Sequence, residues 1–472
     1  MTSIIADTLS NLDSLGIPYV VWKNIQDIDK ALLDKSDLDI YIPSVNKCDA
    51  ISFFKNNGWI QFDNPIAIYP WVIHLYKVSE LQCSHLHIYF KIVTGESWLK
   101  EYILPTPEHW LKNRVKSKEH NLWVLDNQSQ CEIFIIRYLL KGLSLSSRYL
   151  YKNEIASYSK EWRAASDNFD LEKFNKKYFI DTAFLKNLQI DSQRISLPSL
   201  SSSLKARIYF SGCLRFSIFS LIFRRLYSFV RRFINKFLLR QGKMFIGPGL
   251  VIAISGLDGA GKSTLLRSLI ELYGSFLTVK TYHLGRPYGK VLDYLRKSFK
   301  KSRCSAIRVS TKKDGNQELS ALFILKSVFI ALLRLQMAKC AIKSALKGKL
   351  ILVDRWPINV IGKMDGPRIT STPTSSLMQR YGYSIEKWVY DLMPRADICI
   401  YLQVPLETAL TRNTIREKEE KETDEELIAR YEVNSGLKPI ADKIIYYDNS
   451  NTFEKCKLDI ISIIWDEICS RK

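Results

Sequence analysis

The sequence predicts an α/β protein with an N-terminal α+β domain and a C-terminal domain built on a parallel sheet. From residue 246 onward, buried-strand runs alternate with amphipathic helical segments, an order that produces a parallel sheet with helices on both faces. Before about residue 125, short runs rich in β-branched and aromatic residues alternate with helical stretches, and residues 129 to 190 read as helices. The 472 residues, 46% of them apolar, suffice for two or three folded domains. We therefore expect domains at 1–195 and 246–472, joined by residues 196–245.

Four runs in the first domain predict strands: "YVVWKN", "LDIYIP", "AIYPWVIHLYKV" and "HLHIYFKIV". Within "KSDLDIYIP", Asp37 and Asp39 are two residues apart, so both carboxylates point to one face of a strand and could hold a divalent metal. With the preceding strand, this pair resembles the nucleotidyltransferase fold, which implies an α+β domain with a helical extension and metal-dependent nucleotidyl transfer. Where that fold carries a third carboxylate, this chain has His85 and His87, which are either metal ligands or ordinary hydrogen-bonded residues.

The segment between the domains begins with "SLPSLSSS" at 196–203, a serine-rich run that predicts a linker. A helix should follow, because apolar residues from Phe216 to Phe237 step by three and four and form one stripe. Four arginines of this helix lie away from the stripe: Arg224, Arg225, Arg231 and Arg232.

The charge of this segment points to an anionic partner. The chain has a net charge of +21, and no acidic residue occurs between Asp191 and Asp258. One interpretation is a helix packed between domains with a solvated basic face. The other is a helix lying on an anionic membrane through residues 205–243, with apolar side chains in the lipid and arginines at the headgroups. Nucleic acid is disfavoured, because the aromatic residues share the apolar stripe instead of interleaving with the arginines.

Residues 254–266, "ISGLDGAGKSTLL", carry a G-x-x-x-x-G-K-[ST] motif between a strand-like run and an amphipathic helix. Its glycines let backbone N–H groups surround phosphate oxygens, Lys262 reaches the terminal phosphates, and Ser263 offers a hydroxyl to Mg²⁺. The motif predicts binding of ATP with Mg²⁺. The expected contacts come from Gly256, Asp258, Gly259, Ala260, Gly261, Lys262, Ser263 and Thr264.

Two further strands of the second domain lead into charged residues. The run "GKLILVDRW" ends in Asp354 and Arg355, and the carboxyl ends of parallel strands open on the ligand crevice. We expect Asp354 to hold Mg²⁺ and Arg355 to clamp an acceptor phosphate. The strand "ADICIYLQV" precedes a charged segment in which Arg412 and Arg416 share one helical face. These arginines could form a lid over the transferring phosphate.

In this order, the motifs resemble thymidylate kinase and its nucleoside-monophosphate-kinase relatives over residues 246–472. The resemblance implies that Asp258 approaches the sugar of the acceptor. It also implies that the acceptor is bound by Arg286 in "HLGRP", Arg334 and Arg355.

The resemblance also assigns catalytic roles, as in the subclass with a small residue at the position of Ala260 and a cationic lid. The implied catalytic residues are Lys262, Arg355, Arg412 and Arg416. Two departures fall in the acceptor site: the Glu of the family's Arg-Glu-Pro segment is missing, and "PINVIGKMDGPRI" at 357–369 replaces a serine-rich segment.

The expected function is therefore ATP-dependent transfer of the γ-phosphate to a nucleoside monophosphate or a similar acceptor. Two alternatives stay open: a sugar or glycan kinase of surface-polysaccharide metabolism at the membrane, and a non-catalytic nucleotide-binding regulatory protein. Nine cysteines without metal-binding spacing and an N-terminus without a basic n-region favour a cytoplasmic location, including the inner face of the membrane. A homodimer is an open option.

Overall fold

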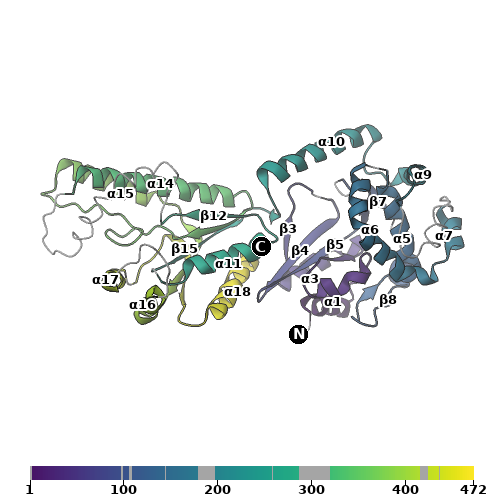
Figure 1. Cartoon of the computed structure of the whole chain (residues 1–472), viewed down its shortest axis with the longest axis horizontal. Coiled ribbons are helices and arrows are strands. Elements are labelled where there is room, and N and C mark those ends of the chain that lie inside the picture. The colour runs from purple at the N-terminus through teal and green to yellow at the C-terminus, as the bar shows by residue number, and fades with distance from the viewer. Residues whose placement is uncertain are drawn as a thin grey trace. The chain divides into compact units, whose positions relative to one another are not determined.

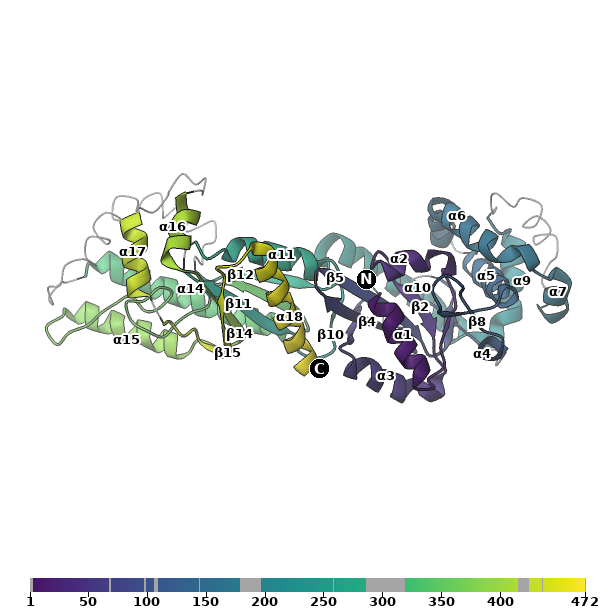
Figure 2. The same cartoon turned by 90° about the horizontal axis from the view of Figure 1, so that it is seen from below.

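The computed structural model describes residues 3–67, 69–96, 99–105, 109–143, 145–178, 197–257, 259–285, 319–414, 424–434 and 436–471. The chain divides into two compact units, drawn in Figures 1 and 2. Unit 1 contains Met1–Lys243 together with Ile461–Lys472, and unit 2 contains Met244–Ile460.

Unit 1 has the α+β composition that the sequence predicts, around a mixed sheet. Within the unit the strands of this sheet follow the order β3-β4-β5-β2-β1-β9-β8, with β2 parallel to β5 and most other pairs antiparallel. These strands are β1 (Val20–Val21), β2 (Leu38–Tyr41), β3 (Ile60–Asp63), β4 (Val72–Ser79), β5 (Gln82–Tyr89), β8 (Val115–Lys116) and β9 (Trp123–Val124). A separate antiparallel pair is formed by β6 (Ile92–Thr94) and β7 (Tyr102–Leu104). The resemblance of this unit to nucleotidyltransferases stays a prediction.

The helices of unit 1 are α1 (Ile4–Ser14), α2 (Ile28–Leu32), α3 (Lys47–Asn56), α4 (His109–Lys112), α5 (Asn127–Lys141), α6 (Leu145–Ala165), α7 (Leu171–Tyr178), α9 (Leu200–Tyr209) and α10 (Ile218–Ile234). One apolar core lies between the sheet and helices α1 to α3, and a second surrounds α5. Helix α5 is buried along nearly its whole length and begins at Asp126, whose carboxylate accepts the Ser129 N–H.

The serine-rich run is not a linker over 200–203, and this prediction is wrong there. Ser199 caps α9 by accepting the N–H of Ser202, and both Ser202 and Ser203 are buried. The physical reason is that serine favours a helix N-terminus, where its hydroxyl satisfies a backbone N–H that the helix leaves unpaired. Helix packing against α5 then outweighs the loop preference of the sequence.

Unit 2 is the predicted parallel sheet with helices on both faces. Its five strands follow the order β12-β13-β11-β14-β15, and all four neighbouring pairs are parallel. The strands are β11 (Leu250–Gly256), β12 (Val279–His283), β13 (Leu350–Asp354), β14 (Ala396–Gln403) and β15 (Ala441–Asp448), and a short β10 (Met244–Phe245) precedes them. The residues of β11 are buried throughout, which explains why the sequence reads there as a continuous apolar run.

The helices of unit 2 are α11 (Lys262–Gly274), α14 (Ala321–Ala345), α15 (Leu377–Asp391), α16 (Leu406–Thr414), α17 (Asp424–Val433) and α18 (Phe453–Arg471), whose end belongs to unit 1. Figure 1 shows α14 and α15 side by side above the sheet, with α11 on its other side. In Figure 2, α16 and α17 lie close together.

Helix α14 is long and apolar enough to cross a membrane by length and composition alone. Its small residues Ala331, Ala338 and Ala341 are buried in the core of unit 2, together with Val251 and Val353 of the sheet. Packing on the sheet thus accounts for one face of this helix, whereas Leu322 and Leu325 on α14 are 62% and 59% exposed.

Candidate active site

The glycine-rich loop joins β11 to α11 at the point where the strand order of the sheet reverses. Strand β11 lies between β13 and β14, and ligands of parallel α/β sheets bind at such a switch point. Gly256 has φ +141°, and a Cβ there would lie 2.5 Å from the Leu402 carbonyl oxygen. Gly261 has φ +82° and directly precedes α11. A residue with a Cβ would clash or be strained at both positions, so the backbone conformation explains why the motif has glycine at 256 and 261.

Lys262 folds back over this loop. Its Nζ donates to the Leu257 carbonyl at 2.6 Å, and the residue is only 7% exposed. Ser263 and Thr264 follow in the first turn of α11 and are exposed, where the helix N-terminus favours an anion. A phosphate entering the loop would take the place of the Leu257 carbonyl as the partner of the lysine.

Asn449 braces the loop, and the sequence interpretation missed it. Its Nδ2 donates to the Ala260 carbonyl at 2.8 Å, and its backbone N–H donates to Gln403 at the end of β14 at 2.7 Å. The residue is 3% exposed and directly follows β15. Its position directly after a parallel strand could have identified Asn449 as a site residue, because the same position predicted Asp354.

Asp354 lies at the end of β13, in register with His283 at the end of β12. His283 Nδ1 is 3.0 Å from Asp354 Oδ2. Burial alone would raise the pKa of Asp354, but the hydrogen bond and charge of His283, followed by Lys262 and Arg355, lower that pKa below its usual value. Oδ1 is buried and has no hydrogen-bond partner among the described residues. An ionised carboxylate whose second oxygen has no hydrogen-bond partner among the described residues can bind a Mg²⁺ ion or one of its water ligands.

Two of the three arginines predicted to bind the acceptor, Arg334 and Arg355, converge on one carboxylate. Arg334 Nη2 is 3.2 Å from Asp365 Oδ1, and Arg355 Nη1 is 3.2 Å from Asp365 Oδ2. Arg355 Nη1 also lies 3.5 Å from the Gly256 carbonyl, which connects this group to the phosphate loop. Arg334 further donates to the Tyr390 hydroxyl at 2.6 Å. Asp365 lies within the segment 357–369, where the sequence departs from the family pattern, and no sequence motif marks it as a site residue.

The predicted lid begins beside the loop. Arg412 in α16 donates from Nη2 to the Asn449 carbonyl at 3.0 Å, so one residue, Asn449, contacts both the lid helix and the phosphate loop. Three predicted site residues lie outside the described part of the chain: Asp258, Arg286 and Arg416.

The predicted metal pair of the first domain belongs to unit 1. Asp37 and Asp39 lie near His87 Nδ1, at 3.5 and 3.0 Å, because β2 runs parallel to β5 with Asp39 opposite His87. Lys23 Nζ is 2.8 Å from Asp39 Oδ1. Hydrogen bonding to His87 holds the pKa of Asp37 well below its usual value. Burial opposes ionisation of Asp39, yet Lys23 and His87 lower its pKa as well. The donor set fits a divalent metal, with Lys23 as a competing cation.

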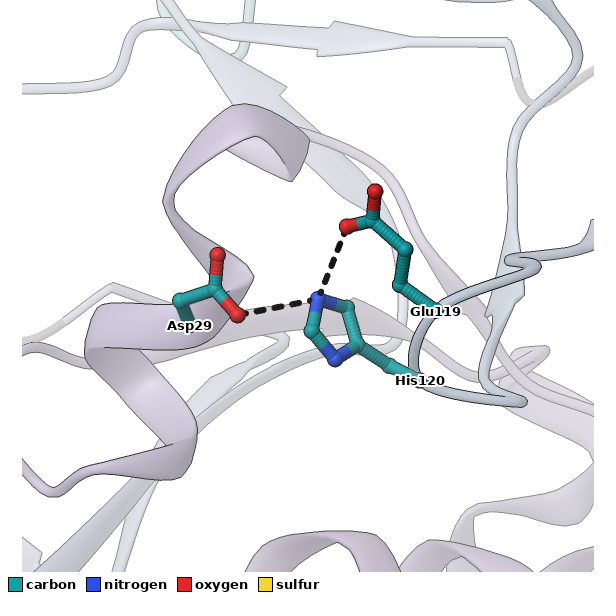
Figure 3. Close-up of side chains that lie close together, drawn as sticks. All are labelled: Asp29, Glu119 and His120. Carbon is teal, nitrogen blue, oxygen red and sulfur yellow. Dashed lines mark ion pairs between the residues drawn. The ribbon is translucent and has the colours of Figure 1, made fainter.

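A second group with metal-ligand chemistry in unit 1 has a different character. His120 Nε2 lies 3.2 Å from Asp29 and 3.7 Å from Glu119 (Figure 3). The two carboxylates are 71% and 82% exposed. Exposed carboxylates around a histidine form an ordinary surface ion-pair cluster, and we assign it no site.

Comparison with known proteins bears on about half of the chain. No family model matches it. The chain is 23% identical over 222 residues to the thymidylate kinase of Blochmanniella floridana, across 46% of this chain and 96% of that protein. It is 25% identical over 180 residues to the uncharacterized ATP-binding protein YghS of Escherichia coli (strain K12), across 35% of this chain and 73% of that protein.

Among solved structures, a thymidylate kinase from Candida albicans matches at 14% identity and a TM-score of 0.31, across 47% of this chain and 94% of that chain. The two sequence similarities are distant, and both relatives are nucleotide-binding proteins by name. About half of this chain is thus distantly similar to a thymidylate kinase and to an ATP-binding protein, as a P-loop kinase-like region would be.

Proposed function

We propose that the protein transfers the γ-phosphate of ATP to a small-molecule acceptor in the crevice of unit 2. The observation that carries this proposal is the loop between β11 and α11, where Gly256 and Gly261 adopt positive φ and Lys262 folds back to donate to the Leu257 carbonyl. The loop amides and Lys262 would hold the phosphates of ATP. Ser263 and Asp354 would hold Mg²⁺, which supplies charge neutralisation between the phosphates when bound.

The arginines of the site have two proposed roles, which are binding of the acceptor and stabilisation of the transition state. Arg355 contacts both the Gly256 carbonyl of the phosphate loop and the carboxylate of Asp365, which we place beside the acceptor. Arg412 is held beside the loop by Asn449 and would turn toward developing charge when the lid closes. Arg416 is assigned the same role from the sequence alone. This arrangement lowers the barrier by positioning and electrostatics, as phosphoryl transfer requires.

The test compares Lys262→Ala with Lys280→Ala, an exposed lysine of β12 in the same unit. Binding of a non-hydrolysable ATP analogue and transfer from labelled ATP are measured against a panel of nucleoside monophosphates, nucleosides and sugars. Lys262→Ala should abolish transfer with the fold intact, because no other side chain of the loop delivers a cation to the terminal phosphates. Unchanged turnover in that variant would remove the loop from the mechanism. Steady ATP hydrolysis without any acceptor would favour a regulatory protein.

A second candidate function, metal-dependent nucleotidyl transfer in unit 1, is favoured by one observation. Asp39 on β2, His87 on the adjacent parallel β5 and Asp37 just before β2 bring their ligand atoms together, and His87 Nε2 is buried with no partner among the described residues. Lys23 partly neutralises the pair and would have to yield to a metal. Metal binding to the full chain, measured with Mn²⁺, tests this candidate independently of ATP.

A further inference from the structure

The two arginines Arg334 and Arg355, to which the sequence assigns the acceptor, already hold an anion, the carboxylate of Asp365. Both oxygens of Asp365 are engaged, one by Arg334 and the other by Arg355, each at 3.2 Å. The three side chains are 11%, 1% and 12% exposed, so the group is withdrawn from water. Tyr390 completes it by accepting from Arg334 and donating to the Gly366 carbonyl at 3.0 Å.

The backbone also holds this carboxylate in place. Asp365 has φ +65° and Arg355 has φ +68°, conformations that non-glycine residues adopt rarely and keep only when their surroundings enforce them. An incoming phosphate would have to compete with Asp365 for these two arginines, and displacing Asp365 would leave a buried carboxylate without its partners. This buried group therefore disfavours a dianion at the arginines to which the resemblance to nucleoside-monophosphate kinases assigns the acceptor phosphate.

We propose that the acceptor offers a hydroxyl group instead of a phosphate, and that Asp365 accepts the proton of that hydroxyl. This inference rests on the proposed phosphotransfer. The acceptor oxygen forms a bond to the γ-phosphorus of ATP, the bond from that phosphorus to the bridging oxygen breaks, and ADP leaves with the electron pair. The hydroxyl proton passes to the Asp365 carboxylate and then to solvent. Arg355, in contact with both Asp365 and Gly256, links the base to the phosphate loop.

The first experiment measures binding of dTMP and of inorganic phosphate by calorimetry, with the ATP analogue present. Asp365→Asn should gain at least about tenfold in affinity for both probes, because it releases two arginines from a carboxylate. Asp365→Glu should stay like the wild type. Asp442→Asn is the matched control, since it removes an exposed carboxylate that also pairs with an arginine, Arg395. No gain in the Asp365→Asn variant, with the ATP analogue still bound, overturns the inference.

The second experiment measures transfer. The wild type should phosphorylate a member of the nucleoside and sugar panel and none of dTMP, UMP and CMP, and Asp365→Asn should lower kcat about 100-fold or more with the ATP affinity unchanged. Efficient phosphorylation of dTMP by the wild type overturns the hydroxyl acceptor and leaves the proposed phosphotransfer intact. Absence of ATP-analogue binding in the wild type instead refutes the proposed function itself.

A second inference concerns helix α10 of unit 1. The apolar stripe predicted for 216–237 forms on α10, but it is not covered: Phe219 is 81% exposed, Phe223 74% and Leu226 62%. Figure 1 shows α10 on the outside of its unit. The arginines lie away from the stripe, as predicted, but several of them face the protein instead of forming a solvated basic face. Arg225 pairs with Glu96 and Glu101 at 3.3 and 3.1 Å, Arg232 donates to the Tyr69 hydroxyl, and Arg231 donates to the Pro65 carbonyl.

These contacts attach α10 to unit 1 with the stripe turned outward, and a basic hollow lies beside it. This hollow of about 190 Å³ is lined by Arg215, Arg224 and Arg231, with Phe216 and Tyr227. The hydrogen bonds of its arginines go to backbone carbonyls and to the Ser220 hydroxyl, and among the described residues none of the three pairs with a carboxylate. Burial, followed by the charge of Arg224, lowers the pKa of Arg215 below its usual value, as expected where cations gather without enough anions.

We infer that α10 docks on a membrane containing anionic lipids, with a lipid phosphate in the basic hollow and the stripe in the acyl region. An anionic lipid supplies both an anion and hydrocarbon, and the segment from 192 to 257 contains no acidic residue that would repel it. Exposed Lys236 and Arg240 extend the basic surface at the end of the helix. A second copy of the chain would bring two sets of uncompensated arginines together and is disfavoured.

The test is sedimentation of the full chain with vesicles of phosphatidylcholine alone or with 30% phosphatidylglycerol. The wild type should bind only the anionic vesicles and release in high salt. The triple variant Phe219→Ser, Phe223→Ser, Leu226→Ser should bind at least about tenfold more weakly, because these side chains are exposed and their loss spares the fold. The control variant Tyr381→Ser, Trp388→Ser, whose residues are exposed on α15, should bind like the wild type.

Three outcomes overturn this second inference. They are failure of the wild type to bind anionic vesicles at low salt, equal loss of binding in the α15 control, and a stripe variant that changes only the oligomeric state in sedimentation velocity. Free inorganic phosphate serves as a competitor: if it releases the protein at constant ionic strength, a soluble phosphate is the ligand and the membrane assignment fails.

Discussion

Gly256→Ala should destabilise unit 2 and disable its phosphate loop. The Cβ of alanine would lie 2.5 Å from the Leu402 carbonyl oxygen, closer than side chains approach a backbone oxygen in folded proteins. Gly256 and Leu402 are register partners in the β11–β14 ladder, so neither atom can retreat without parting the two strands. The φ of +141° adds strain of about 1–3 kcal/mol for any residue with a Cβ. Together with the collision we expect a loss of about 3 kcal/mol or more.

The assay is urea unfolding of the full chain with and without the ATP analogue, since the transition that the nucleotide shifts reports on unit 2. Gly274→Ala is the control, because Gly274 ends α11 with no atom within 4 Å of the position its Cβ would take. That variant should match the wild type or gain up to about 1 kcal/mol from the better helix former. Gly256→Ala should also bind the analogue at least about tenfold more weakly. A Gly256→Ala variant that unfolds with the wild type and binds the analogue equally would refute the reasoning.

Three other predictions concern the lid, the metal pair and a buried lysine. Arg412→Ala should lower kcat by ~10² while the KM for ATP changes little, and an effect confined to KM would make Arg412 a ground-state contact. Changing Asp37 and Asp39 together to Asn should stop any nucleotidyl transfer and spare ATP-dependent phosphorylation, whereas retention of both activities would leave the pair without a catalytic role. Burial lowers the pKa of Lys243 from 10.5 to about 8, so the unfolded chain binds more protons between these values and stability should rise with pH across that window. Lys243→Met should therefore stabilise unit 1 by about 1–2 kcal/mol at pH 7, after allowance for the partial exposure of this side chain, and the gain should shrink by pH 10. A loss of stability at pH 7 would show that the contact of Lys243 with the Tyr76 ring contributes more than the burial of the charge costs.

Local sequence alone determined the parts of this protein that depend on short-range chemistry. The loop of Gly256, Gly261 and Lys262 could be predicted because each residue is required by the backbone or the phosphate at its own position. The parallel sheet followed from the alternation of buried runs and amphipathic helices, and Asp354 followed from the rule that strand ends meet at one edge.

Only the tertiary structure decided which distant side chains meet. Asp365 joins Arg334 to Arg355, and Asn449 joins the lid to the loop, across separations in the chain that no periodicity encodes. The stripe of α10 could be read from the sequence, but which of its faces points outward depends on the ion pairs of Arg225 with Glu96 and Glu101, more than 120 residues away. An amphipathic pattern specifies that a helix has two faces, whereas the partners that each face finds are set by long-range packing and charge.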